Sequence, residues 1–506
     1  MVRISELAMA ACRSIGRWPH RLAMSAWMLC MLGACTVGPD YVPPKMTLPD
    51  SFAEHAPVTA GTALKPVAPL DAWWQNFGDA VLDQLIDEAL QASPDLAAAQ
   101  ARVREARALR GVAGAALYPE ADADAAYART HGSANVPVGV PPGGLGPGAD
   151  GNLWQAGFDA SWEIDVFGGN RRGIEAADAS WQAAVAERGD ITLTLVAEIA
   201  RNYIEVRGAQ RRLAVARDNL ATQRDALALT RSQFDAGLAS RLDVLRSQAL
   251  VADTEAVVPD LTAESRAAIY RIGALIGHQP ETLLAELDTP ATIPAPIADV
   301  PIGLPSELLQ RRPDIRAAER RLAAANARIG VVKADLYPHF YLTGAAGVES
   351  LEASTFLTAP SRYLSVGPGI RWLIFDAGKV RFGVEAQQAR TDEAAASYQR
   401  TVLEALRDVE TALASYGQSR IRRERLAEEA ASDREAVTVA TRLYRQGLED
   451  FLSVLDAERS LYAAEDKLAQ TDRDSDLSLV ALYKSLGGGW PAREETALSS
   501  ASAGKP

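Results

Sequence analysis

The amino-acid sequence predicts a mainly α-helical fold with a membrane β-barrel, in a homotrimer whose chains each contribute four strands to a barrel of about 12. Three observations support this prediction. The chain contains an internal repeat, each repeat holds strands of alternating polar and apolar residues, and each repeat holds a very long helix without proline. The helices are expected to continue the barrel as a long α-helical barrel.

Residues 1–34 are predicted to be a signal peptide. Arginines precede a short apolar stretch, Leu22 to Leu32, which is too brief to cross a bilayer as a mature helix. Leu32-Gly33-Ala34-Cys35 then resembles a bacterial lipobox, so Cys35 is expected to be acylated and to become the new N-terminus. An ordinary secretory peptide with an incidental Cys35 is the alternative. Because Cys12 and Cys30 fall inside the removed segment, no intrachain disulfide is expected.

Residues 35–70 are expected to form a lipidated tether. The run from Gly38 to Pro44 contains three prolines, so it is expected to be extended and not helical. In the lipoproteins that this segment resembles, an acidic residue after the cysteine favours retention in the inner membrane. Thr36 therefore indicates the outer membrane of a Gram-negative bacterium.

The rest of the chain is predicted to be two copies of one unit, at 71–290 and 291–490, before a disordered tail at 491–506. The segment 94–119 matches 313–338 without a gap, at an offset of 219 residues, and about half of the positions are identical. Further on, Gly237-Leu238 recurs as Gly447-Leu448 and 162–164 recurs as 372–374, both at an offset of 210 residues.

Two strands are expected in each unit, at about 120–130 and 153–164 and at about 339–349 and 363–375. From Trp154 to Ile164, apolar and polar residues alternate over roughly ten residues, the length of a tilted membrane-spanning strand. The pattern recurs from Leu364 to Ile374. The core strands of a β-sandwich would also alternate, so the strands alone leave that alternative open.

A proline-free helix follows each pair of strands, at about 171–236 and at about 379–446. At 1.5 Å per residue each helix is on the order of 100 Å long, far more than a globular domain needs. A shorter helix opens at Pro94 or Pro313, and a returning helix follows a turn at Gly237 or Gly447. Stacked end to end, the two shorter helices together would match the length of the long helix.

The strands are too few to close a barrel within one chain, because about eight strands are the usual minimum. An open sheet edge in lipid would leave backbone groups without hydrogen-bond partners. Three copies would supply enough strands for a water-filled barrel and a matching ring of helices. The chain is therefore expected to assemble with itself.

The composition argues against nucleic-acid binding and against catalysis. Lys and Arg total 52 against 65 Asp and Glu, so a basic patch is not expected. The five histidines are isolated, and the sequence has no catalytic, nucleotide-binding or metal-binding motif. We expect neither an enzyme nor a cofactor or metal, apart from the covalent lipid on Cys35.

Several motifs together resemble the outer-membrane factor family, the TolC-like channels of tripartite efflux systems. They resemble most closely its lipoprotein branch (OprM/NodT-like), which serves resistance-nodulation-division pumps. The motifs are the lipobox followed by Gly38-Pro39-Asp40-Tyr41, the repeats that begin at Pro94 and Pro313, and the runs 162–168 and 486–490. The resemblance implies an exit duct in the outer membrane that passively conducts small toxic compounds or drugs from the cell.

The same resemblance implies partners and docking residues. The partners are the other copies in the homotrimer, a periplasmic membrane-fusion (adaptor) protein, an inner-membrane resistance-nodulation-division transporter and outer-membrane lipid. The adaptor-docking tips fall at Gly237, Leu238, Gly447 and Leu448. Glycine suits a turn with positive φ, and an exposed leucine beside it suits a contact. Simple hairpin turns with the leucines packed inward are the alternative.

Three acidic residues are candidates for a gate or for the pore lining. Asp243 lies where some family members tie neighbouring helices into a closed iris, although its counterpart in the second unit is Ser453. Asp408 and Glu410 are candidates from their charge alone. An ordinary solvated charge is the alternative for all three.

Two other functions remain open at this stage. A type I secretion system uses the same kind of duct for protein export. A lipid-anchored coiled-coil scaffold without a pore would explain the helices and the lipid, but not the paired alternating strands. The exported compounds and the identity of the adaptor cannot be read from the sequence.

Overall fold

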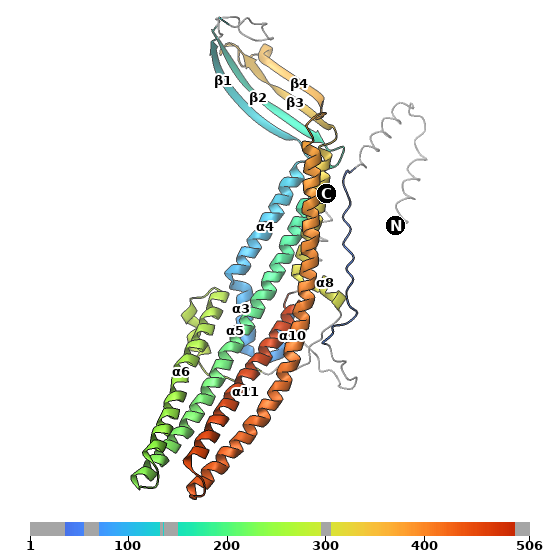
Figure 1. Cartoon of the computed structure of the whole chain (residues 1–506). Coiled ribbons are helices and arrows are strands. Elements are labelled where there is room, and N and C mark those ends of the chain that lie inside the picture. Colours follow the sequence, from blue (N-terminus) through green and yellow to red (C-terminus); the bar gives the residue numbers. More distant parts are fainter. Residues whose placement is uncertain (1–35, 55–69, 132–134, 136–149, 295–304, 491–506) are drawn as a thin grey trace. The chain divides into compact units, whose positions relative to one another are not determined.

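The computed structural model describes residues 36–54, 70–131, 135, 150–294 and 305–490 (Figure 1). Cys35, the predicted signal peptide and the predicted C-terminal tail lie outside the described residues. Within the described ranges, no helix combines the length and the apolar character needed to cross a bilayer. The chain divides into two compact units, and each unit draws on both predicted repeats.

The same order of elements occurs twice: a helix, two strands, a long helix and a returning helix. The first series is α4 (Pro94–Ala115), β1 (Glu120–His131), β2 (Asp150–Ile164), α5 (Gly169–Asp235) and α6 (Arg241–Ile276). The second series is α9 (Pro313–Ala334), β3 (His339–Ser350), β4 (Arg362–Arg371), α10 (Lys379–Arg445) and α11 (Phe451–Ser485). Corresponding long helices have the same length, 67 residues.

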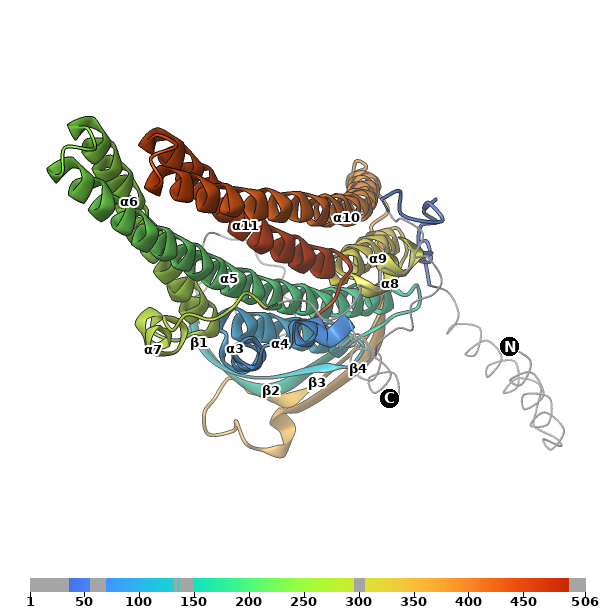
Figure 2. The same ribbon diagram turned by 90° about the horizontal axis from the view of Figure 1, so that it is seen from below.

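Short helical segments precede or follow these series. They are η1 (Leu70–Phe77), α3 (Ala80–Ala92), η2 (Pro280–Leu283), α7 (Leu284–Leu287), η3 (Pro305–Glu307), α8 (Leu308–Arg311) and η4 (Ala359–Ser361). In both views of the ribbon, α6 returns beside α5 and α11 returns beside α10, so each long helix ends in a hairpin (Figures 1 and 2).

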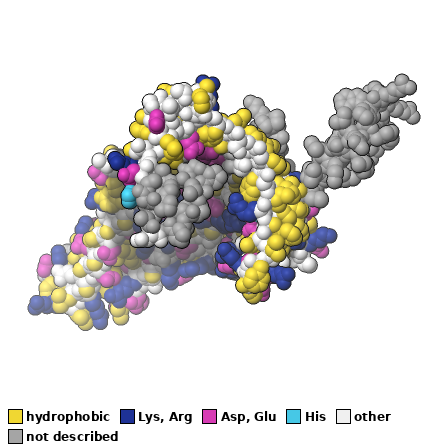
Figure 3. All heavy atoms as spheres, turned by 90° about the horizontal axis from the view of Figure 1, so that it is seen from above, with side chains coloured by type: hydrophobic (Ala, Val, Ile, Leu, Met, Phe, Trp, Pro, Cys, Tyr) yellow, Lys and Arg dark blue, Asp and Glu magenta, His cyan; other side chains and the backbone are white. Residues whose placement is uncertain are grey.

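Among the described residues, the first unit, which we call the strand unit, comprises 36–43, 106–131, 135, 150–181 and 321–395. Its four strands form one antiparallel sheet in the order β1-β2-β3-β4. Because side chains alternate across a strand, the cross-strand pairs assign Phe158, Ala346 and Leu364 to one face, and Asp124, Gly157 and Gly347 to the other. The view onto this end of the chain shows exposed hydrophobic side chains beside scattered acidic ones (Figure 3).

A tryptophan fixes each turn from helix to strand. Helices α4 and α9 stop shortly before Pro119 and Pro338, which have no N–H to donate. The indole Nε1 of Trp162 donates to the carbonyl of Leu117 at 2.9 Å, and Trp372 donates to the carbonyl of Leu336 at 3.2 Å. Each bond therefore gives a partner to a carbonyl group in the turn that follows the helix.

Within the single chain, the fourth strand is shorter than the predicted range of 363–375. Strand β4 ends at Arg371, which pairs with His339, the first residue of β3. Pro338 precedes His339 and cannot donate to a ladder, so β3 offers no partner beyond this point. Residues 372–375 keep the alternating sequence but have no strand beside them in the described part of the chain.

The second unit, which we call the helical unit, comprises the described residues 44–54, 70–105, 182–294, 305–320 and 396–490. Its main core joins η1 and α3 to α5, α6 and α11. Trp73 is fully buried and stacks on Tyr483 with 4.9 Å between ring centroids. Asp79 caps α3 and also accepts a hydrogen bond from the Tyr203 hydroxyl on α5 at 2.6 Å.

Candidate docking tips and duct-lining residues

The first candidate tip is the turn between α5 and α6. Gly237 has φ of +76°, and the amide of Leu238 donates back to the carbonyl of Gln233 at 2.8 Å. This is the pattern in which glycine in the left-handed region ends a helix. A Cβ at Gly237 would have no atom within 4 Å, so the φ angle alone calls for glycine here.

The turn between α10 and α11 has the same form. Gly447 has φ of +73°, and the amide of Leu448 donates to the carbonyl of Leu443 at 3.0 Å. Leu238 is 80% exposed and Leu448 is 69% exposed. In the single chain neither leucine packs inward, so the alternative of buried hairpin leucines does not hold.

Below the tips, the two hairpins pack on each other through apolar side chains. Leu250 on α6 packs with Phe451, Val454 and Leu455 on α11, and Tyr444 of α10 lies against this cluster. The hairpins therefore present both exposed leucines from one packed four-helix segment.

Asp243 is part of a helix cap. Its Oδ2 accepts from the Ser240 amide at 3.0 Å and from the Ser240 hydroxyl at 2.7 Å, while the Asp243 amide donates to that hydroxyl at 3.2 Å. In the second hairpin the roles are reversed, because Asp450 caps α11 by accepting from the Ser453 amide at 3.0 Å. The mismatch between Asp243 and Ser453 thus reflects two versions of the same cap.

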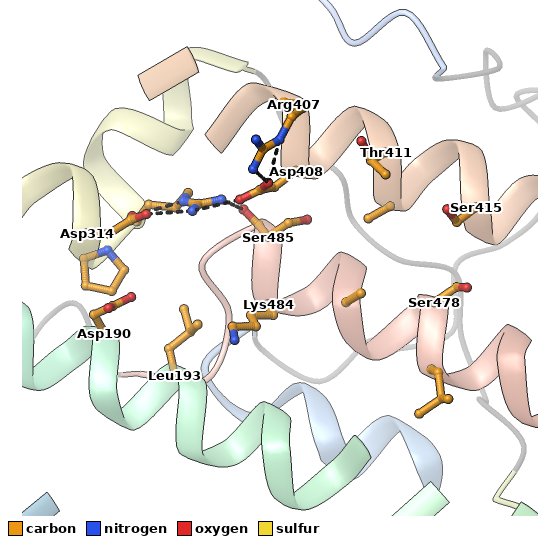
Figure 4. A pocket seen from close by; sticks show the side chains of 15 residues that line it. Asp190, Leu193, Asp314, Arg407, Asp408, Thr411, Ser415, Ser478, Lys484 and Ser485 are labelled. Carbon is orange, nitrogen blue, oxygen red and sulfur yellow. Dashed lines mark hydrogen bonds and ion pairs between the residues drawn. The ribbon is translucent and has the colours of Figure 1, made fainter. Parts of the chain in front are cut away.

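Asp408 lies in a pocket of about 630 Å³ in the helical unit (Figure 4). Its Oδ1 accepts from Arg407 Nη2 at 2.7 Å, and its Oδ2 lies 3.5 Å from Arg312 Nη2. Arg312 also binds Asp314 at 2.6 Å and the carbonyl of Ser485 at 3.1 Å. Burial lowers the pKa of Arg312, but the hydrogen bond with Asp314 and the nearby carboxylates outweigh it, so the pKa lies above its usual value.

Asp190 faces this charged cluster from α5. Burial raises its pKa, and the charge of Asp314 raises it further, whereas Arg312 and Lys484 act in the opposite direction. Within one chain Asp408 is therefore one member of a network of charges of both signs.

Glu410 has a different environment from Asp408. Its two carboxylate oxygens accept from the amides of Ala53 at 2.8 Å and Glu54 at 3.2 Å. The adjacent Phe52 is buried. Within one chain Glu410 thus holds Ala53 and Glu54, which lie inside the predicted tether, and its place in the pore lining stays a prediction.

The described start of the tether, residues 36–43, is held on the strand unit. Arg172 at the start of α5 donates to the carbonyl of Val37 at 3.2 Å and to Asp40 at 2.7 Å. Gly38 packs so closely on Gly330 that a Cβ at Gly38 would lie 2.6 Å from the Gly330 Cα. The segment is not helical, in agreement with the prediction, and residue 36 lies against Gly168, directly before α5.

Comparison with known proteins identifies the chain. A model of a family described as outer membrane efflux protein matches residues 85–278 and 304–488. The chain belongs to this family. It is therefore an outer-membrane efflux channel, and the two matched segments each contain one of the two series of elements.

Relatives of this efflux channel match it over nearly their full length. The pyoverdine export outer membrane protein OpmQ of Pseudomonas putida is 34% identical, over 94% of this chain and 99% of that protein. Nodulation protein T of Rhizobium leguminosarum bv. viciae is 31% identical, over 94% and 95%. The solved structure of the outer-membrane channel OprN is 39% identical and superposes with a TM-score of 0.83, covering 90% of this chain and 100% of that one.

The efflux channel also holds buried carboxyl groups that the sequence analysis missed. Glu458 on α11 is 5% exposed, and burial raises its pKa to about 7. Its Oε2 has no hydrogen-bond partner among the described residues. Glu458 follows Phe451, Val454 and Leu455 at helical spacing on the apolar face of α11, and this acidic residue on an apolar stripe was the available signal.

Asp476, nearer the C-terminal end of α11, is a second buried carboxyl group. Burial is the main cause that raises its pKa to about 7, and the charge of Asp472 adds to it. Arg423 acts in the opposite direction. Both groups lie inside the helical unit and titrate near neutral pH.

Proposed function

We propose that three copies of this chain form the exit duct of a tripartite efflux pump. The duct passively conducts small toxic compounds or drugs from an inner-membrane resistance-nodulation-division transporter and its adaptor to the outside. The observation that carries the proposal is the four-stranded sheet with one apolar face and two outer edges, β1 and β4, that have no strand partner among the described residues.

In lipid such edges must be paired, because an unpaired backbone amide or carbonyl there costs several kcal/mol. One sheet of four strands is too small to close on itself. Three sheets joined edge to edge give about 12 strands, with the apolar face toward lipid and the polar face toward a water-filled lumen. The long helices continue this lumen into the periplasm.

The tips of the two hairpins dock the adaptor. Leu238 and Leu448 are exposed beside rigid glycine turns, and Leu242 and Leu452 on the following helices are also exposed. Exposed leucines on a soluble surface are a favourable contact area for a partner protein. Asp243, Asp408 and Glu410 remain candidates for the gate or the pore lining in the trimer.

The lipid on Cys35 anchors the chain in the outer membrane. The contacts of residues 37–40 with Arg172 and Gly330 support this part of the proposal, because they hold the residues after Cys35 at the end of the sheet. The acyl chains then enter the same leaflet that the sheet meets. No catalysis and no cofactor other than this lipid is part of the proposed function.

The names of the relatives favour export of small molecules over protein secretion. Besides the pyoverdine exporter, a solvent efflux pump outer membrane protein of Pseudomonas putida is 30% identical over 92% of this chain. A coiled-coil scaffold without a pore is disfavoured, since it has no use for a sheet with an apolar face.

Conductance in planar bilayers tests the proposal. Purified protein is expected to produce discrete, long-lived conductance steps, and the same protein denatured by boiling is the control. Insertion verified by protease protection without any conductance would contradict the duct. In cells, deletion of the gene is expected to raise drug sensitivity; unchanged sensitivity together with loss of a secreted protein would favour the type I secretion alternative.

A further inference from the structure

Tyr363 on β4 lies across two neighbouring strands on the polar face of the sheet. It pairs with Gly347 on β3, which in turn pairs with Gly157 on β2, so the three residues share this face. A Cβ added to Gly347 would lie 2.9 Å from Tyr363 Cε1, and a Cβ added to Gly157 would lie 2.5 Å from the Tyr363 hydroxyl oxygen. The ring therefore lies flat over both glycines and does not stand upright from the sheet, as side chains on strands ordinarily do.

The two glycines are required for different reasons. At Gly347 the nearest atoms to an added Cβ belong to the backbone of β2, with the Ala156 carbonyl oxygen at 2.5 Å, so the close approach of the strands calls for glycine. At Gly157 the nearest atom is the Tyr363 hydroxyl oxygen, and the next, the Ala346 carbonyl oxygen, is 3.1 Å away. Glycine inside a strand often marks the close approach of another group. At Gly157 that group is the end of the Tyr363 side chain.

The first repeat lacks this arrangement. The repeat offsets make Leu153 the counterpart of Tyr363 and Ala128 the counterpart of Gly347, and Leu153 and Ala128 are paired in the structure. The repeated unit therefore accepts a residue with a Cβ at the position of Gly347. The tyrosine lying on glycine is a feature of the second hairpin alone and not a requirement of the shared fold.

We propose that Gly157 and Tyr363 together set the size of the compounds that can leave the duct. This inference rests on the proposed function, in which the polar face lines a water-filled lumen. Each copy contributes one tyrosine at this level, and a ring that lies against the wall leaves the lumen wide. An upright ring projects into the lumen, so a side chain at position 157 that lifts the ring narrows the exit.

Gly157→Ala tests the proposal, and Gly367→Ala is the matched control. Both glycines lie on the polar face, but a Cβ added to Gly367 has no atom within 4 Å. The reporter is Ser161→Cys, at an exposed polar-face position on the helix side of Gly157. Polyethylene glycol maleimides of increasing size, added outside intact cells, reach this cysteine only past the tyrosines. N-ethylmaleimide measures the intrinsic reactivity of the cysteine, and the chain without an added cysteine is the blank.

The expected result is a lower size limit in Gly157→Ala. The largest probe that labels the reporter in the parent should label it at least fivefold more slowly in this variant, whereas the rate in Gly367→Ala and the rate with N-ethylmaleimide stay within twofold. A second reporter, Glu349→Cys, lies on the loop side of Tyr363 on the same face and should keep its rate. Adding Tyr363→Ala to Gly157→Ala should restore labelling at position 161, because the lifted ring is then absent.

Tyr363→Ala alone tests the proposal with both glycines in place. A ring that already lies flat takes little of the width, so this variant should label within twofold of the parent. A severalfold rise would show that the ring stands in the lumen and would overturn the proposal. An unchanged rate in Gly157→Ala, at the parent's level in the outer membrane, would also overturn it, as would a slowed rate that Tyr363→Ala does not restore. Labelling of the parent by N-ethylmaleimide but by no polyethylene glycol maleimide would instead contradict the open duct of the proposed function.

Discussion

The guanidinium of Arg172 lies 2.7 Å from the carboxylate of Asp40, and so joins the start of α5 to the segment that follows the predicted lipid anchor. Arg172 is almost fully buried, whereas Asp40 is exposed. The same side chain donates to the carbonyl of Val37 and binds Glu175 at 2.7 Å. The guanidinium of Arg172 thus binds both the tether and the first turn of α5.

Arg172→Ala is expected to release residues 36–43 from the strand unit. A hydrogen bond to a charged group contributes about 2 kcal/mol, so the released state should become roughly 30-fold more populated. Limited proteolysis of the tether measures this change. Asp40→Asn keeps the contacts with Val37 and should have a smaller effect; an equal effect of both variants would mean that the ion pair alone holds the tether.

Leu238→Glu combined with Leu448→Glu is expected to abolish adaptor binding without affecting assembly. Both side chains are exposed, so the change should alter folding stability by less than about 0.5 kcal/mol. Copurification of the adaptor and drug sensitivity are the measurements. Leu357→Glu, at an exposed position in the β3–β4 connection, is the matched control. Normal adaptor binding by the double variant would exclude the tips as the docking site.

Gly237→Ala is expected to destabilise the first hairpin tip by about 1 kcal/mol, because alanine disfavours the positive φ that this turn requires. Amide hydrogen exchange at the ends of α5 and α6 should become about fivefold faster. Gly417→Ala is the control, since Gly417 lies inside α10 with φ outside the positive region and with open space around it. Equal exchange in both variants would argue against strain at the turn.

Glu458→Gln is expected to stabilise the protein above neutral pH. Burial raises the pKa of Glu458 in the folded state to about 7, so the folded state favours the protonated form. The stability that this protonation provides is complete below the ordinary pKa of glutamate and is lost as pH rises through 7. The melting temperature of the variant should therefore exceed that of the wild type at pH 8.5, by an amount that disappears near pH 4.

The ionised carboxylate costs up to about 3 kcal/mol at high pH, because each unit of pKa corresponds to 1.36 kcal/mol. Asp456→Asn, an exposed position two residues away on α11, is the control and should show no such pH dependence. A constant difference between Glu458→Gln and wild type at every pH would indicate a packing effect and not titration.

Helix ends and turns that are set by a single residue could be predicted from the sequence. The helix ends at Pro119 and Pro338 and the turns at Gly237 and Gly447 depend on backbone properties of single residues, and they lie where the sequence predicted them. The cap at Asp243 also had a local signal, because serine followed by aspartate three residues later is a capping pattern.

Features that depend on distant residues could not be predicted. Glu410 holds amides more than 350 positions earlier in the chain, and nothing in its local sequence indicates this contact. The ion pairs of Asp408 depend on how α9 and α10 pack. The end of β4 depends on which strand lies beside it, so an alternating pattern could give the sequence of a strand but not its length within one chain.

The two hairpins of the sheet differ in their connections, with residues 132–149 between β1 and β2 and the shorter segment 351–361 between β3 and β4. Around the proposed ring of three copies, longer and shorter connections would therefore alternate. The repeated strands would approach sixfold symmetry, whereas the connections between them would allow only threefold symmetry.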